Sequence, residues 1–333
     1  MDTTNANVPF LKDSQMLARL EKANYESINI NELPKMQSFP KPFPENSMAA
    51  MRSAVGAGAI GIETDIHLSR DGVVVLSHDK DLGRCFGIDK KVIDCDWDYL
   101  STLRSTRAPG EPLARLEDLL EYLAQPDLDH VWLLLDIKTD NEPDTVMRLV
   151  AKTINTVTPS QRPWSDRIVL GCWTAQFVPL CAQHLPGFPI THIGASICYA
   201  RQFLDVPNCA FNMFYKACYG PFGRRFMNKV KNLNRDLFLW TVNDPNIMKW
   251  AIQQGVQGVI TDNPKLFNDI CDSWQDDEPP VRFTWRECLM GTALYLFVGI
   301  LMTFFRVKQY LSKRRHLQIQ AHGKEAHGVS GIY

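Results

Sequence analysis

The sequence predicts an α/β protein: a (β/α)8 TIM barrel followed by a C-terminal apolar membrane helix. Apolar, strand-like runs alternate with helix-like stretches from about residue 47 to residue 272. This alternation is typical of parallel strands that are joined by crossover helices. A run of 18 residues without a charged side chain, 288–305, then follows. That length is just sufficient for a membrane-spanning helix.

The barrel is predicted from the order of these runs. Residues 131–137, VWLLLDI, are apolar almost throughout, which is typical of a strand covered on both faces. A weaker strand is predicted near 33–38. An open doubly wound sheet is the alternative fold, but no G-x-G-x-x-G motif opens a first helix. The other predicted strands are 60–68, 73–76, 167–172, 188–193, 208–213, 237–242 and 256–260. The predicted helices are 116–123, 143–156, 175–184, 199–203, 223–231, 245–254 and 264–274.

The chain divides by composition into a body and two ends. The N-terminus has no apolar h-region, so we expect no secretory signal peptide. Basic residues flank the distal end of the apolar run. The predicted segments are a loose N-terminal stretch (1–30), the barrel (31–274), a linker (275–285), a membrane-inserted segment (286–307) and a basic tail (308–333).

Overall charge excludes one class of partner. The chain has 36 Lys and Arg residues and 37 Asp and Glu residues, a net charge of −1. Without a basic excess we expect no nucleic acid partner. The nine cysteines form no C-x-x-C pair, which argues against both a zinc site and a disulfide framework.

A cluster of polar side chains interrupts the first long strand. Glu63, Asp65 and His67 are spaced by two residues within 60–68, so they lie on one face of the strand. Two carboxylates that point into a crowded interior repel each other, and a divalent cation relieves that repulsion. Ligands that are all oxygen suit Mg²⁺ or Ca²⁺. The alternative is a pair of surface carboxylates on an amphipathic strand.

Further candidates lie at other strand ends, where barrel enzymes place their catalytic groups. Asp136 and Lys138 end the run 131–137, as a third metal ligand and a phosphate-side cation, or as a simple ion pair. His78 follows 73–76 and could donate a proton to a leaving alkoxide, or be a structural histidine. Trp240 is either a core residue or a ligand platform.

Five motifs occur in an order that is recognisable: PENSMAA (44–50), GAIGIETDIHLSRDGVVVLSHDKDLGR (58–84), LLLDIK (133–138), WTVN (240–243) and GVITDNP (258–264). Through them the chain resembles the glycerophosphodiester phosphodiesterase family. E-x-D followed by H-D, D-I-K and W-T-V-N is a specific combination. The apolar tail and the RCFG sequence are most similar to the fungal, membrane-attached phosphatidylglycerol phospholipase C type.

The resemblance implies a barrel of the phospholipase C-like phosphodiesterase type with a divalent cation. It implies that Glu63, Asp65 and Asp136 bind the metal. It assigns catalysis to His78, as general acid, and to Lys138. Glu45 and Trp240 are implied to lie at the substrate pocket, and His67 is a weaker candidate beside them.

One part of the sequence departs from the family pattern. The family has H-R-G shortly before P-E-N, and this chain has Met36, Gln37 and Ser38 there. A missing general base typically lowers a rate by about 10²–10⁴-fold. His67 could replace the missing imidazole in part, since it shares a strand face with Glu63 and Asp65.

The sequence therefore predicts a hydrolase that cleaves a phosphodiester in a phosphatidylglycerol-like lipid or a glycerophosphodiester. The alternative is a catalytically impaired, membrane-tethered protein that binds phospholipid head groups; a sphingomyelinase D type is less favoured. The apolar segment predicts a membrane partner and attachment through the C-terminus. The catalytic domain is expected in the cytosol, at the endoplasmic reticulum, mitochondrial outer membrane or lipid droplet.

Overall fold

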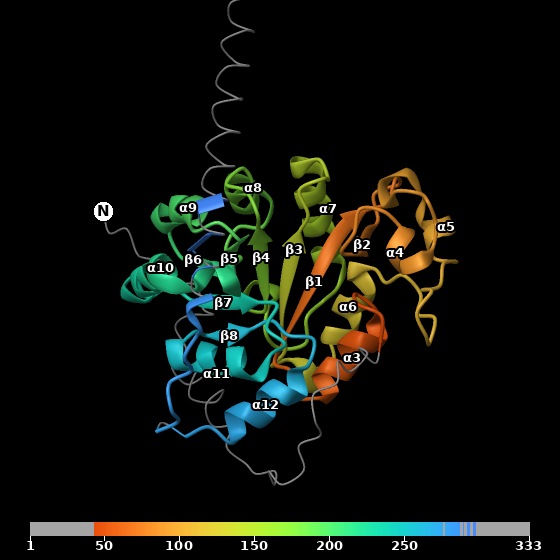
Figure 1. Cartoon of the computed structure of the whole chain (residues 1–333). Coiled ribbons are helices and arrows are strands. Elements are labelled where there is room, and N and C mark those ends of the chain that lie inside the picture. Colours follow the sequence, from red (N-terminus) through yellow and green to blue (C-terminus); the bar gives the residue numbers. More distant parts are fainter. Residues whose placement is uncertain (1–42, 276, 287–288, 290–291, 294–295, 298–333) are drawn as a thin grey trace, which may run out of the picture.

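The computed structural model describes residues 43–275, 277–286, 289, 292–293 and 296–297 (Figure 1). The predicted strand near 33–38 and the triplet Met36, Gln37 and Ser38 lie outside the described residues. The same holds for most of the predicted membrane segment and for the basic tail.

One curled sheet of eight strands forms the centre of the molecule, in the order β2-β1-β3-β4-β5-β6-β7-β8. All neighbouring strands are parallel except β1 and β2. This confirms the predicted α/β, TIM-barrel-like fold. The strands are β1 (Gly61–Leu68), β2 (Val74–Leu76), β3 (Trp132–Ile137), β4 (Ile168–Cys172), β5 (Ile190–Gly194), β6 (Cys209–Phe214), β7 (Leu237–Trp240) and β8 (Gly258–Val259).

The prediction of one strand unit needs correction. Residues 73–76 were expected to continue the series of parallel strands, but β2 pairs antiparallel with β1 and places Val75 opposite His67. Only a short turn separates the two strands, whereas a parallel connection needs a crossover of a dozen or more residues. Within the described part of the chain no strand joins β8 to β1, so the closed eight-unit barrel stays a prediction.

Helices cover the sheet, and their ends follow local sequence signals. Glu142 caps α7 by accepting hydrogen bonds from the backbone N–H groups of Asp144 and Thr145. The longer helices are α3 (Met48–Gly56), α6 (Leu116–Leu123), α7 (Pro143–Thr156), α8 (Phe177–His184), α10 (Gly220–Asn232), α11 (Pro245–Gln254) and α12 (Pro264–Asp272). The shorter ones are α4 (Gly83–Phe86), α5 (Trp97–Leu100) and α9 (Ile197–Ala200).

Two hydrophobic clusters flank the sheet. One joins β1, β3 and β4 to α6, α7 and α8, and the other joins β5, β6 and β7 to α10 and α11. The first encloses Arg167, whose guanidinium donates hydrogen bonds to the carbonyls of Leu123, Leu128 and Val131 at 2.8–3.0 Å. This side chain fastens the connection after α6 to the start of β4.

Among the described residues, no helix is both long and apolar enough to span a membrane. The predicted membrane segment 286–307 falls mostly outside them. The predicted membrane helix and the division of the chain into five segments therefore stay predictions.

Candidate active site

Parallel pairing of β1 with β3 brings three acidic side chains together. The register places Asp65 opposite Asp136, and Glu63 lies two residues earlier on β1. One carboxylate oxygen from each residue lies within 4.8 Å of the others. Figure 1 shows both strands ending at the same edge of the sheet. The acidic cluster that the sequence predicts is therefore formed by adjacent strands.

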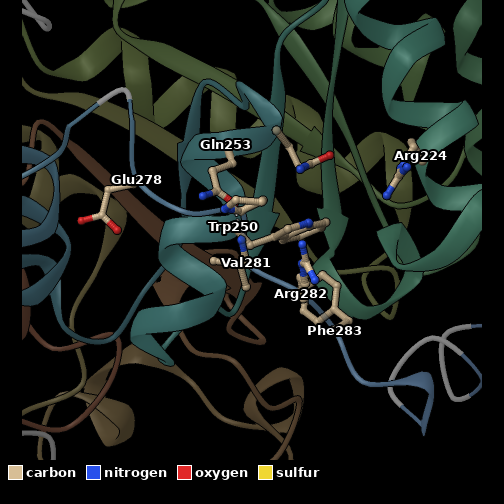
Figure 2. Close-up of a pocket in the computed structure, with 9 residues that line it drawn as sticks. Arg224, Trp250, Gln253, Glu278, Val281, Arg282 and Phe283 are labelled. Carbon is tan, nitrogen blue, oxygen red and sulfur yellow. Dashed lines mark hydrogen bonds between the residues drawn. The ribbon is translucent and has the colours of Figure 1, made fainter.

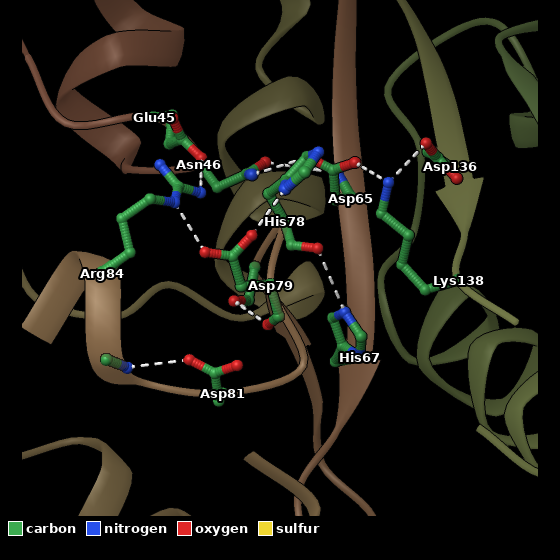
Figure 3. A network of polar contacts seen from close by, with 12 residues as sticks. Glu45, Asn46, Asp65, His67, His78, Asp79, Asp81, Arg84, Asp136 and Lys138 are labelled. Atoms are coloured by element: carbon green, nitrogen blue, oxygen red, sulfur yellow. Dashed lines mark hydrogen bonds and ion pairs between the residues drawn. The ribbon is translucent and has the colours of Figure 1, made fainter. Parts of the chain in front are cut away.

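Lys138 lies directly on two of these carboxylates. Its Nζ is 2.5 Å from Asp65 Oδ1 and 2.8 Å from Asp136 Oδ2 (Figure 3). The side chain is mostly buried. The indole of Trp173, directly after β4, donates a hydrogen bond of 2.6 Å to Asp136 Oδ1. Both oxygens of Asp136 thus have a donor, and the predicted pairing of Asp136 with Lys138 is present.

Asn46 holds the other side of the cluster. Its side-chain nitrogen donates to Asp65 Oδ2 at 2.8 Å, and its oxygen accepts from Thr64 Oγ1 at 2.6 Å and from the Asp65 backbone N–H at 3.2 Å. Asn46 has φ of 54°, a conformation that asparagine adopts more readily than most residues. Sequence reasoning missed this role, although Asn46 stands beside Glu45 in the P-E-N motif.

Burial and mutual repulsion shape the electrostatics of the acidic cluster. Part of the Glu63 side chain reaches the surface, but packing around its carboxyl group, and then the charges of Asp65 and Asp136, raise its pKa well above the ordinary value. Burial raises the pKa of Asp136 to about 6, while Lys138 opposes the shift. Without a cation, burial and mutual repulsion therefore favour the protonated forms of Glu63 and Asp136.

Lys138 responds in the opposite sense. Burial alone would lower its pKa, but the charges and hydrogen bonds of Asp136 and Asp65 together raise it above the ordinary value. Lys138 is accordingly a cation at neutral pH and offsets part of the charge of the cluster.

His78 lies on the loop after β2, with more than half of its side chain exposed. Its Nδ1 is 2.8 Å from Asp79 Oδ1. A carboxylate only accepts hydrogen bonds, so Nδ1 carries the hydrogen and Nε2 is left for another group. A hydrogen bond from Arg84 is the main reason why the pKa of Asp79 is lowered to about 2. Asp79 therefore stays ionised and fixes the tautomer of His78.

Glu45 belongs to the same chain of polar contacts. Arg84 on α4 donates to Glu45 Oε1 at 2.5 Å and to Asp79 Oδ2 at 2.6 Å (Figure 3). Arg84 therefore bridges Glu45 and Asp79 beside His78. The sequence did not single out Arg84. The proposed contact of Glu45 with substrate stays a prediction.

His67 lies beneath the His78 loop. Its side chain is buried, with Nδ1 3.4 Å from Asp140 Oδ2 and Nε2 3.4 Å from the backbone oxygen of His78. Burial lowers its pKa. Both ring nitrogens already have neighbours, so the geometry favours support of the His78 loop over direct contact with substrate.

Aromatic side chains form one wall beside the acidic cluster. The rings of Trp173 and Trp240 are 5.8 Å apart, and those of Phe214 and Trp240 are 5.2 Å apart. Trp240 Nε1 donates to the backbone oxygen of Asn212 at 2.9 Å. The Lys138 ammonium lies 5.6 Å from the centroid of the Trp173 ring. Trp240 thus adjoins the acidic cluster through Trp173, and its predicted place at the substrate pocket stays a prediction.

The donor set fits a hard divalent cation. Glu63, Asp65 and Asp136 offer only carboxylate oxygens, the ligands that Mg²⁺ and Ca²⁺ prefer. Burial, and then the charges of Asp65 and Asp136, raise the pKa of Glu63, and a cation bound to the three acids would favour their ionised forms. Carboxylates for a cation, an ammonium and an imidazole are the groups needed to cleave a phosphate ester.

Comparison with known proteins agrees with this geometry. A model of the glycerophosphoryl diester phosphodiesterase family matches residues 37–266. The uncharacterized protein YqiK of Bacillus subtilis is 26% identical over 230 residues, which cover 67% of this chain and 91% of YqiK. Mouse lysophospholipase D GDPD3 is 25% identical over 289 residues, which cover 74% of this chain and 83% of that protein.

A similar fold is found in a solved structure from Oleispira antarctica, a phosphodiesterase in complex with the product sn-glycerol-3-phosphate. The TM-score is 0.58 and the sequences are 17% identical, and the match covers 69% of this chain and 92% of that one. The family match spans the whole sheet and every site residue described above. The chain therefore belongs to the glycerophosphoryl diester phosphodiesterase family.

Proposed function

We propose that the chain hydrolyses a phosphodiester in a glycerophospholipid or a glycerophosphodiester. The observation that carries this proposal is the convergence of Glu63, Asp65 and Asp136 with Lys138 on β1 and β3. Mouse GDPD3 is named a lysophospholipase D, and the Oleispira enzyme was solved with sn-glycerol-3-phosphate. Both names support a glycerol phosphate ester as substrate.

The three carboxylates would hold Mg²⁺ or Ca²⁺. A cation bound there would polarise a phosphoryl oxygen and lower the pKa of an attacking hydroxyl or water. Asn46 and Trp173 orient Asp65 and Asp136 by hydrogen bonds, so the carboxylates are already in position before a cation binds.

Two side chains would act on the phosphate itself. Lys138 would offset the negative charge that builds up on the phosphoryl oxygens, since its ammonium already lies at the acidic cluster. His78 would protonate the departing alkoxide through Nε2, while Asp79 holds Nδ1–H. Arg84 keeps Asp79 and Glu45 in place.

Two products are expected, according to substrate. A phosphatidylglycerol-like lipid would give glycerol phosphate and diacylglycerol, and a deacylated substrate would give glycerol 3-phosphate and an alcohol. The apolar segment at 286–307 favours the intact lipid, because an attached enzyme and a lipid share one surface. This is the reaction of the fungal phosphatidylglycerol phospholipase C type, with the catalytic domain in the cytosol.

The competing hypothesis is a head-group binder without turnover, motivated by Met36 and Gln37 in place of histidine and arginine. The test compares the parent, His78→Ala and the double variant Met36→His/Gln37→Arg in hydrolysis of a glycerophosphodiester. Parent hydrolysis that needs a divalent cation and is lost in His78→Ala excludes the binder. A parent without activity, beside a double variant that gains it, contradicts the hydrolase.

A further inference from the structure

Positive charge is concentrated in one segment of this nearly neutral chain. Residues 206–235 contain six basic side chains and no Asp or Glu. The six are Lys216, Arg224, Arg225, Lys229, Lys231 and Arg235. The chain as a whole has a net charge of −1, so this local excess is compensated elsewhere and not at the segment itself.

Helix α10 presents most of this charge to the surface. Its buried face consists of Gly223, Phe226, Met227 and Val230, which pack in the second hydrophobic cluster. Arg224, Arg225, Lys229 and Lys231 are all exposed. Among the described residues, no carboxylate pairs with these four side chains, so the outer face of α10 is cationic there.

A strap made of residues 277–283 runs beside this helix. The side chain of Gln253 on α11 fixes the strap backbone: it donates to the Pro279 oxygen at 3.0 Å and accepts from the Val281 N–H at 2.8 Å. The ring of Phe283 lies 4.2 Å from Tyr219 and 5.2 Å from Trp250. The chain that follows residue 283 therefore starts from a fixed place next to α10.

The strap and α11 line a cavity of about 600 Å³, to which α10 contributes Arg224. Figure 2 shows Trp250, Val281 and Phe283 in this cavity, with Arg282 and Arg224 at its side. Arg224 comes from α10 and Arg282 from the strap, and the lining also includes Glu278, which pairs with Lys249 on α11. The cavity does not include any residue of the acidic cluster.

Exposed apolar side chains occur on α10, directly after it, and in the chain that follows the strap. Among the described residues nine large hydrophobic side chains are exposed, and six of them either flank the cationic face of α10 or follow the strap. These are Phe222, Leu233, Trp285, Leu289, Leu296 and Phe297. Cationic side chains next to exposed aromatic and aliphatic ones are typical of a surface that lies against a lipid headgroup region.

We propose that the outer face of α10, together with Arg282 of the strap, docks on the anionic headgroups of a phospholipid bilayer. Charge complementarity supplies the attraction, and the apolar side chains after the strap favour a bilayer over a nucleic acid duplex, whose outer surface is a charged phosphate backbone. The proposal goes beyond hydrolysis and does not depend on it.

The first test follows lysine reactivity in the full-length chain. The protein is mixed with vesicles of phosphatidylcholine alone or with about 30% phosphatidylserine, a composition that gives a negative surface potential. Phosphatidylserine avoids the phosphatidylglycerol that the active site could consume. We expect acetylation of Lys229 and Lys231 to fall several-fold only on anionic vesicles. Lys152, exposed on α7, is the internal control. Equal labelling of all three lysines on anionic vesicles would overturn the proposal.

The second test uses a matched pair of variants. Arg225→Gln/Lys229→Gln removes two charges from α10, and Arg148→Gln/Lys152→Gln removes the same residue types at the same spacing from the exposed face of α7. We expect the first to slow association with anionic vesicles about tenfold and the second to leave it unchanged. Equal rates for the two variants contradict the docking surface, as does tighter binding of the parent to a duplex RNA than to these vesicles.

A third measurement separates this inference from the proposed hydrolysis. Hydrolysis of a soluble glycerophosphodiester does not need a bilayer, so Arg225→Gln/Lys229→Gln is expected to retain the rate of the parent. Loss of soluble hydrolysis in this variant would contradict a role confined to docking. A parent that binds anionic vesicles as expected but never hydrolyses the soluble substrate would contradict the hydrolase and leave the docking surface standing.

Discussion

Lys138 is the residue that joins the two strands of the site, because its ammonium contacts one carboxylate on each. Replacing it by methionine keeps the aliphatic stem and removes the charge. Loss of one partner of a buried ion pair costs about 3–5 kcal/mol. Loss of one electrostatic stabiliser of a transition state lowers kcat about 10²–10³-fold.

We therefore expect Lys138→Met to unfold at lower denaturant in metal-free buffer and to hydrolyse substrate at least about 100-fold more slowly. Denaturant unfolding and steady-state kinetics measure the two effects. Lys152→Met, on the exposed face of α7, is the control and should match the parent in both. A Lys138→Met protein with unchanged stability and kcat would remove Lys138 from the mechanism.

The sequence predicted which acidic and basic side chains lie together at the candidate site. Glu63, Asp65, Asp136 and Lys138 come together because period-two spacing and strand register determine which side chains share a face. Asn46 and Trp173 were not predicted, since each acts from a loop across a gap in sequence of 19 or more residues. Trp173 does follow a strand end, so the rule that found Asp136 applies to it as well.

The segment between β2 and α6 is the element whose contribution the sequence did not reveal. It carries α4 and α5, and Arg84 on α4 links Glu45 before α3 to Asp79 beside His78. Helices of four residues have too few positions to show a period, so pattern analysis does not detect them. The antiparallel pairing of β2, by contrast, could have been predicted from the sequence, because only a short turn separates β2 from β1.

Removal of the Arg84 side chain tests whether this segment orients the proposed acid. Without Arg84, Asp79 loses a hydrogen bond and its lowered pKa moves back toward the ordinary value. We expect Arg84→Ala to lower kcat about tenfold and to shift the acidic limb of the pH–rate profile upward. Arg104→Ala, in the same segment but bonded only to backbone oxygens, should change neither. An unaltered pH profile in Arg84→Ala would mean that Asp79 needs no support from α4.

Arg167 links two elements of the fold, because it joins the end of α6 to the start of β4. Its guanidinium satisfies three backbone carbonyls in a fully buried place. Arg167→Met fills a similar volume but leaves those acceptors without a donor, so we expect a loss of about 3 kcal/mol or more in unfolding free energy. Arg148→Met, exposed on α7, should lose nothing measurable. Equal stability of the two variants would show that water replaces the guanidinium.

Over the whole molecule, the acidic cluster sets how stability depends on pH and metal. The raised pKa values of Glu63 and Asp136 mean that the folded chain binds their protons more tightly than the unfolded chain. Their contribution to stability is therefore present at low pH and lost as the pH rises through the raised values, with Asp136 losing it near pH 6.

In the presence of a chelator, this cluster should therefore stabilise the folded chain less at pH 7 than at pH 5. Thermal unfolding should then give a lower melting temperature at pH 7. Addition of Mg²⁺ at 100 times its Kd should restore about 2.7 kcal/mol at pH 7. Glu63→Gln removes one of the repelling charges, so its metal-free form should melt higher than the parent at pH 7 and respond less to Mg²⁺. A Glu63→Gln protein that melts lower than the metal-free parent would contradict repulsion at this site.

We propose that the acidic cluster and Lys138 form a metal-dependent phosphodiesterase site. The most direct test is release of glycerol 3-phosphate from a soluble glycerophosphodiester by the full-length chain, with and without a chelator, beside Asp65→Asn. We predict release that requires a divalent cation, is restored by adding it back, and falls at least about 100-fold in Asp65→Asn. Release that is equally fast with chelator present, or in Asp65→Asn, would contradict the claim.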